Sequence, residues 1–161
     1  MTSFENSIHD VGHRAATYKH IELVITSALS RWIDAMSEAA AVSMAGAHAH
    51  VHADHAQMWD SRIPLLWDHE ASRWSADSLP ELLSVIELVG NDSELMNSKL
   101  KLGAMYGRVL PAVLQTYSAH LATIDPRVDP ATAHILQTCV NNTRDNVDQA
   151  RDVIARVASA S

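Results

Sequence analysis

The stretch 48–62, HAHVHADHAQMWDSR, constrains the fold more than any other part of the chain. It carries four histidines within eight residues. On a helix, positions 44, 48, 51, 55, 58 and 62 form one stripe and positions 45, 49, 52, 56, 59 and 63 form the next. Because most other residues of both stripes are apolar, a helix here turns His48, His52 and His55 toward a core. His50 falls on the opposite side, where we expect it to face water.

The rest of the chain also favours helices. Among 161 residues there are only five glycines and five prolines, and runs of β-branched residues are rare. This length corresponds to about one domain, which can bury an ordinary core without cross-links. We therefore predict an all-α protein with a single domain over 1–161, in which residues 1–16 form a short N-terminal helix or an arm.

Composition and charge exclude several classes of protein. The formal net charge is −7 and no cluster of Lys and Arg occurs, so a nucleic-acid-binding surface is not expected. The single cysteine, Cys139, cannot form an intramolecular disulfide and fits a reducing compartment. The N-terminus does not resemble a signal peptide, and no apolar run has the length of a membrane span. We expect a cytoplasmic protein of bacterial type without a nucleic-acid or membrane partner.

Heptad spacing marks the first long helix, from about Thr17 to Met36. Glu22 lies on its apolar stripe. It faces either the core or the edge of the stripe, where an acid is favourable near a helix start. We expect Ser37 to cap the second helix, which ends near Ile63 because Pro64 disfavours helix at the preceding residue.

The later elements are a connection over 64–78, a short helix over 78–90, a third long helix over 93–123 and a last helix from Pro130 to about Ala158. Pro111 is expected to bend the third helix. Asp129 is expected to cap the last helix. Four long helices plus one short helix in the crossover between helices two and three predict a four-helix bundle.

Several segments resemble the ferritin-like superfamily, in particular its small bacterial members. They are Trp32 in the first helix, AHVHADHAQMWDSRIP over 49–64, and YGRVLPAVLQTYSAHLATIDP over 106–126 with the VDPATAHIL that follows. The resemblance covers roughly residues 20–158. It implies a bundle whose core can hold two metal ions, with one Glu from each of two helices and a Glu-x-x-His from each of the other two.

The chain departs from that pattern at most ligand positions. Glu22 matches the first-helix acid, but His52 stands where the second helix should carry its acid. The third helix offers no inward acid, and Thr143–Asn146 has lost both ligands of the fourth helix. These departures argue against a classical di-iron site and predict a degenerate one.

The histidine spacing still favours one metal ion. His48 and His52 are four residues apart and His52 and His55 are three apart, so either pair can place two imidazoles on one ion. With Glu22 the donor set suits Fe²⁺, Zn²⁺ or Ni²⁺. The alternative uses no metal, because a histidine near its ordinary pKa is itself a proton carrier.

We predict a tailoring enzyme of small-molecule biosynthesis with its site in the bundle interior. The predicted catalytic residues are His48, His55, Arg62 and Tyr106, and the predicted substrate-binding residues are Trp59, Tyr117, Thr143 and Asn146. With a metal, the resemblance implies oxidation or hydroxylation. Without one, cyclisation, isomerisation or elimination is expected.

Two non-catalytic alternatives stay open. The histidines could belong to a buried polar network in which Arg62 pairs with Glu22 or Asp145. The protein could also be a helical binding protein that dimerises through an apolar bundle face, since homodimers are the commonest assembly.

Overall fold

The computed structural model describes residues 8–64 and 97–159, and all regular structure within them is helical. The elements are α1 (Ile8–Ile33), α2 (Ala39–Arg62), α4 (Ser98–Ala104), η3 (Met105–Val109), α5 (Leu110–Leu121) and α6 (Pro130–Ser159). Because α4, η3 and α5 follow one another without a break, the described residues form four rods. The prediction of an all-α four-helix bundle is confirmed.

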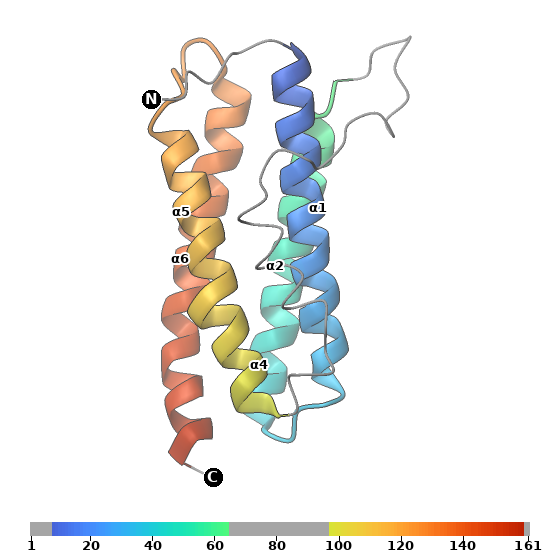
Figure 1. Cartoon of the computed structure of the whole chain (residues 1–161), viewed down its shortest axis with the longest axis vertical. Helices are drawn as coiled ribbons and strands as arrows, with labels where there is room; N and C mark the ends of the chain where they lie inside the picture. The colour runs from blue at the N-terminus through green and yellow to red at the C-terminus, as the bar shows by residue number, and fades with distance from the viewer. Residues whose placement is uncertain (1–7, 65–96, 160–161) are drawn as a thin grey trace.

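The rods are arranged as two antiparallel pairs (Figure 1). One pair is α1 with α2, the other is α5 with α6, and α2 packs against α6 to join them. The α2 helix and the α4–α5 rod begin at the same end of the bundle and run in the same direction. The predicted short helix over 78–90, and the connection over 64–78 apart from Pro64, lie outside the described residues.

The first helix begins earlier than predicted. Residues 8–16 are the first turns of α1 and not a separate arm. In the structure Val11 and Ala15 extend the inward stripe upstream from Tyr18, and Ala15 and Tyr18 are each only 2 % exposed. Residues 1–7 lie outside the described part.

The ends of α2 confirm one expectation and correct another. Glu38, and not Ser37, occupies the capping position, and its side chain makes no capping hydrogen bond. At the other end α2 stops at Arg62, and Ile63 is extended with φ −68° and ψ 121°. This is the conformation that Pro64 favours in the residue before it.

The third rod contains a π-helical turn that the sequence did not predict. In η3 the Leu110 N–H bonds to the carbonyl of Met105, five residues earlier. Pro111 follows directly; it has no N–H to donate, and its ring crowds the carbonyl four residues back. The wider turn accommodates the proline that we expected to bend the helix. Single π turns occur frequently at functional sites.

The core runs the length of the bundle and includes polar side chains. Glu22, His52 and His55 are 0 % exposed, as are large apolar neighbours such as Ile25 and Leu29. Glu22 therefore faces the core and not the edge of the stripe. The predicted cap of α6 is confirmed, because Asp129 Oδ1 accepts the Thr132 N–H at 3.0 Å. None of the described helices combines the length and apolarity needed to cross a membrane.

Candidate metal centre

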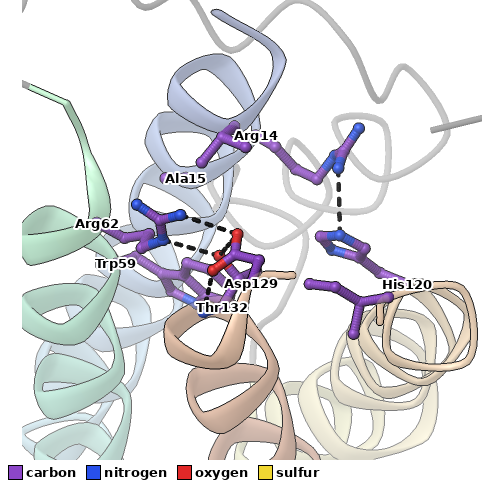
Figure 2. Close-up of a pocket in the computed structure, with 9 residues that line it drawn as sticks. Arg14, Ala15, Trp59, Arg62, His120, Asp129 and Thr132 are labelled. Atoms are coloured by element: carbon purple, nitrogen blue, oxygen red, sulfur yellow. Dashed lines mark hydrogen bonds and ion pairs between the residues drawn. The ribbon is translucent and has the colours of Figure 1, made fainter. Parts of the chain in front are cut away.

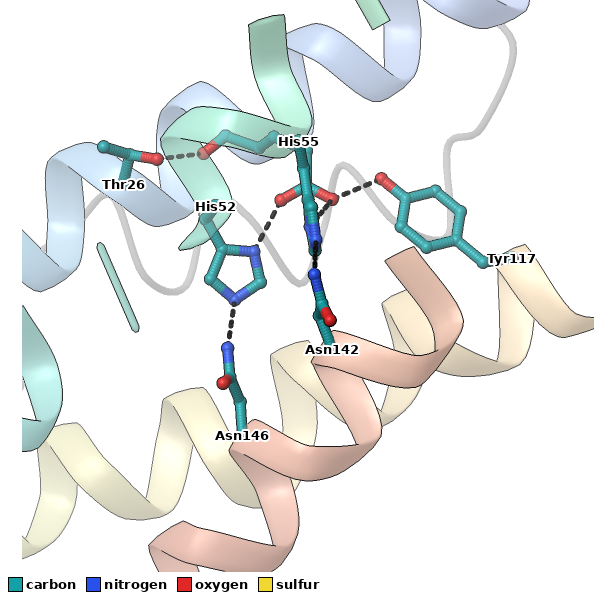
Figure 3. A network of polar contacts seen from close by, with 7 residues as sticks. Thr26, His52, His55, Tyr117, Asn142 and Asn146 are labelled. Carbon is teal, nitrogen blue, oxygen red and sulfur yellow. Dashed lines mark hydrogen bonds and ion pairs between the residues drawn. The ribbon is translucent and has the colours of Figure 1, made fainter. Parts of the chain in front are cut away.

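The carboxylate of Glu22 is the centre of the buried polar cluster, and Figure 3 shows the side chains of His52, His55 and Tyr117 that converge on it. Its Oε2 lies 2.5 Å from His52 Nδ1, and its Oε1 accepts a hydrogen bond from Tyr117 Oη at 2.6 Å. His55 Nδ1 lies 3.4 Å from the same Oε1. Side chains from α1, α2 and α5 thus meet at one buried carboxylate.

Small side chains on α2 allow this meeting. Ala45, Ala49 and Ala56 are buried on the same side of α2 as His52 and His55. Because alanine lets helix backbones approach closely, the short Glu22 side chain of α1 reaches both imidazoles.

The surroundings of Glu22 keep it ionised. Burial by itself raises the pKa of this carboxyl, but the charge and hydrogen bond of His52, followed by the nearby His55 ring, outweigh burial and lower the pKa to about 2. Burial, followed by the adjacent Glu22 carboxylate, raises the pKa of Tyr117 well above its ordinary value. At neutral pH the metal-free site therefore holds a carboxylate beside a protonated phenol.

Three histidines of α2 pair with three carboxamides of α6, in a row that we call the histidine–amide seam. The nitrogen–amide distances are 3.2 Å for His48 and Gln149, 3.4 Å for His52 and Asn146, and 3.1 Å for His55 and Asn142. The order is reversed on α6 because the two helices are antiparallel. A carboxamide can either donate to a bare ring nitrogen or accept from a ring N–H, so the seam suits both states of the rings.

His48 stands apart from the carboxylate. Its Nδ1 lies 2.7 Å from the hydroxyl of Tyr106, which the π turn η3 carries. Burial lowers the pKa of His48 and raises that of Tyr106. The structure thus places two predicted catalytic residues, His48 and Tyr106, beside each other. His48 is not part of the possible ligand group of Glu22, His52 and His55.

Glu22, His52 and His55 can hold a metal ion. One ligand atom from each lies within 4.8 Å of the others, and all three residues are buried. Among the described residues His55 Nδ1 makes no hydrogen bond, and its nearest partner is the Glu22 carboxylate at 3.4 Å, so a bound ion could take up this nitrogen. Metal-bound histidines usually place their second ring nitrogen against a polar partner, which the seam supplies through Asn142 and Asn146.

Arg62 lies elsewhere. Its guanidinium donates to Thr132 Oγ1 and to Asp129 Oδ2, both at 2.8 Å, so the expected pairing with Glu22 or Asp145 is wrong. Arg62 is seven residues from His55, about 10 Å along the helix axis. Its partner is Asp129 because the end of α2 lies beside the start of α6.

A small hollow opens at this end of the bundle (Figure 2). Arg62 with Asp129 lies on one side of it, and Arg14 with His120 on the other. Trp59 contributes to its wall, and the hollow has room for about one water molecule.

Two predicted substrate-binding residues lie in the core near the carboxylate. The rings of Trp59 and Tyr117 are 6.0 Å apart. Thr143 is fully buried, and its hydroxyl has no hydrogen-bond partner in the part of the chain that is described.

Asn142 and Gln149 were not predicted from the sequence. The only signal was the spacing of 142, 146 and 149, which is the same along the chain as the spacing of 48, 52 and 55.

Comparisons of the chain with protein-family models, with curated proteins and with solved structures give no match, so the role of this site has to follow from its own geometry.

Proposed function

We propose that the protein binds one transition-metal ion inside the bundle and uses it to oxidise or hydroxylate a small molecule. The ligands are the Glu22 carboxylate and the Nδ1 atoms of His52 and His55. One observation carries the proposal: these three fully buried groups converge within 4.8 Å, and one of the nitrogens has no hydrogen bond among the described residues.

The donor set fits particular metals and a single ion. Two imidazoles and one carboxylate are typical of mononuclear non-haem iron sites and of some catalytic zinc sites. The charges favour one ion, because two divalent ions would leave a large uncompensated charge beside one buried carboxylate. A bound ion of this kind supplies Lewis-acid or redox chemistry.

The protein's own residues supply position and enclosure. Glu22 compensates positive charge, and the seam fixes the ring planes of His52 and His55. In the metal-free protein Tyr117 holds a proton at Oη beside the carboxylate. Because these side chains are buried, water is kept from the site, and a reactant larger than water reaches it only when the helices move apart.

The path of the chain supports the ferritin-like resemblance. The second and third rods begin at the same end of the bundle and run in the same direction. This order of directions differs from that of a simple up-and-down bundle and is compatible with a ferritin-like one. We therefore keep this resemblance as part of the proposal.

The other interpretations have weaker support. In the metal-free acid–base mechanism Arg62 was expected to help orient the substrate beside the histidines, whereas it pairs with Asp129 at the end of the bundle. The non-catalytic interpretation gives His55 a place in a buried network beside Glu22, but it does not use the convergence of three possible ligands within 4.8 Å.

Metal analysis tests the proposal. Protein purified without a histidine tag is stripped of metal and titrated with Fe²⁺ under anaerobic conditions, and separately with Zn²⁺ and Ni²⁺. We expect uptake of one ion per chain, abolished by His52→Ala and retained by His50→Ala, whose side chain is 80 % exposed on the same helix. Circular dichroism shows whether both variants fold.

Two results would overturn the proposal. One is a wild-type protein that takes up no ion in stoichiometric amount. The other is equal uptake by folded His52→Ala and His50→Ala. If one ion binds, consumption of dioxygen by the Fe²⁺-loaded protein, compared with His52→Ala, tests the oxidative part.

A further inference from the structure

We propose that Tyr117 is a fourth protein ligand of this ion and binds it as a phenolate. The inference rests on the proposed metal site and adds a ligand to it.

The position of the phenol is the first reason. Tyr117 Oη lies 2.6 Å from Oε1 of Glu22, and this oxygen is also the one that faces His55 Nδ1 at 3.4 Å. Metal–ligand bonds of about 2.0–2.2 Å place neighbouring ligands of one ion about 3 Å apart. The distances of Tyr117 Oη and of His55 Nδ1 from Glu22 Oε1 are thus already close to the spacing of neighbouring ligands around an ion.

The direction of approach is the second reason. His52 and His55 reach the carboxylate from α2, whereas Tyr117 reaches it from α5 (Figure 3). A ligand from α5 would complete the coordination on a side that neither histidine covers. Tyr117 is 0 % exposed and packs edge-on against Tyr18 at 4.8 Å, so its ring is held in place.

Charge is the third reason. A divalent ion with one carboxylate and two neutral imidazoles carries a net charge of +1 in a site without solvent, which is costly. The carboxamides of Asn142 and Asn146 cannot compensate it. Tyr117 is in contact with the carboxylate and can supply the second negative charge.

The ligand exchange balances without an oxidant. The Tyr117 O–H bond breaks, a bond forms between Oη and the ion, and the proton leaves to solvent. The ion keeps its oxidation state, and the hydrogen bond from Tyr117 to Glu22 is replaced by a shared ion.

A matched pair of variants tests the assignment. Tyr106 belongs to the same rod and is also buried, but it contacts His48 and not Glu22. Wild type, Tyr117→Phe and Tyr106→Phe are each loaded with one equivalent of Fe³⁺. Phenolate bound to Fe³⁺ gives a visible charge-transfer absorption that imidazole and carboxylate ligands do not give.

We expect this absorption in wild type and in Tyr106→Phe, and its loss in Tyr117→Phe, which keeps the packed ring. Resonance Raman spectra excited in the band should show tyrosinate ring modes. With Zn²⁺, an indicator dye should report one more proton released per ion by wild type than by Tyr117→Phe.

The results that contradict the assignment of Tyr117 can be distinguished from those that contradict the metal site. If wild type binds one ion through His52 but shows no band, or if the band persists in Tyr117→Phe, the assignment of Tyr117 is wrong and the metal site stands. If wild type takes up no ion, both proposals fall.

Discussion

Glu22 is an acidic residue with no exposure to solvent, and its neighbours explain why its carboxylate stays charged. An isolated carboxylate in this position would be strongly destabilising. Here it accepts hydrogen bonds from His52 and Tyr117 and lies near His55. Such a network is favourable only while it is complete, because removal of one member leaves the others buried without a partner.

Replacing Glu22 should therefore destabilise the metal-free protein. We expect Glu22→Gln to lower the free energy of unfolding by about 3 kcal/mol, as for other broken buried pairs. Urea denaturation measures the change. The control Asp54→Asn alters an exposed acid of α2 and should change the free energy by less than about 0.5 kcal/mol. Equal effects of the two changes would contradict the role given to Glu22.

His120, near the C-terminal end of α5, is a second buried polar residue. It is 4 % exposed, its Nε2 accepts from Arg14 at 3.2 Å, and its Nδ1 lies 3.2 Å from Tyr18 Oη. Burial and then the Arg14 charge lower the pKa of His120 to about 4, against a smaller opposite effect of Asp129. The imidazole is therefore neutral in the folded protein at neutral pH.

This neutral state makes stability depend on pH. Between about pH 6.5 and 4 the unfolded chain holds a proton on His120 that the folded protein lacks, so stability falls as the pH is lowered. The loss at pH 4 should approach about 3 kcal/mol. His48, whose pKa is also lowered by burial, contributes a further loss of stability as the pH falls. The stability contributed by the ionised Glu22 is lost at lower pH, between the ordinary pKa of a glutamate and about 2.

Urea unfolding at pH 7 and pH 5 checks the prediction. His120→Gln cannot be protonated, so its stability should change less between the two pH values than that of wild type. Equal changes in both proteins would exclude His120 as the source.

At the scale of the helices, the sequence predicted which residues share a helix face better than it predicted which helix packs against that face. The spacing of His48, His52 and His55 showed that they share the inward side of α2, because periodicity reports which residues lie on one face. It could not show that α6 meets this face, since that depends on how the rods pack. Asn142 and Gln149 were missed for this reason.

The seam should matter for metal affinity more than for folding. We expect Asn146→Leu to weaken Zn²⁺ binding about 10- to 100-fold, because His52 loses the partner that holds its ring. Competition with a chromogenic chelator measures the affinity. The control Asn141→Leu changes a neighbouring exposed residue and should have no effect. An unchanged affinity in Asn146→Leu would show that the seam is only structural.

The short helix α4 can be stabilised independently of the site. Gly103 is exposed, and within the described residues a Cβ built there meets no atom within 4 Å other than those of its chain neighbours and its own helix backbone. Gly103→Ala should raise the free energy of unfolding by about 0.5–1 kcal/mol, because alanine loses less backbone freedom on folding than glycine. Thermal melting or urea denaturation checks it. A decrease would mean that α4 needs the flexibility of glycine.

At the scale of the whole molecule, the fold class followed from composition and periodicity, whereas the π turn and the start of α1 did not. The π turn escaped because hydrophobic spacing cannot distinguish an added residue from a bend at Pro111. The substrate and the possible homodimer stay predictions. Both depend on surfaces that residue types alone do not specify.

Metal binding should stabilise the entire bundle, because its ligands come from different rods. At a free concentration 100 times the Kd, an ion adds about 2.7 kcal/mol. For a chain of this length that corresponds to a rise in Tm of roughly 5–10 °C. Calorimetry with and without Zn²⁺ measures the rise, a chelator should reverse it, and His52→Ala should lack it. An equal rise in that variant would place the ion elsewhere.

The enclosure of Glu22, His52 and His55 has a practical consequence for anyone who handles the protein. Because all three side chains are 0 % exposed within the described residues, we expect an ion to exchange mainly during transient separation of the helices, whose frequency is set by local stability. Purified material should then carry whichever metal was abundant while the chain was folding, and brief dialysis should not replace it. Growth in defined media, each supplemented with one metal, would reveal such kinetic trapping as a metal content that follows the medium and not the order of affinities.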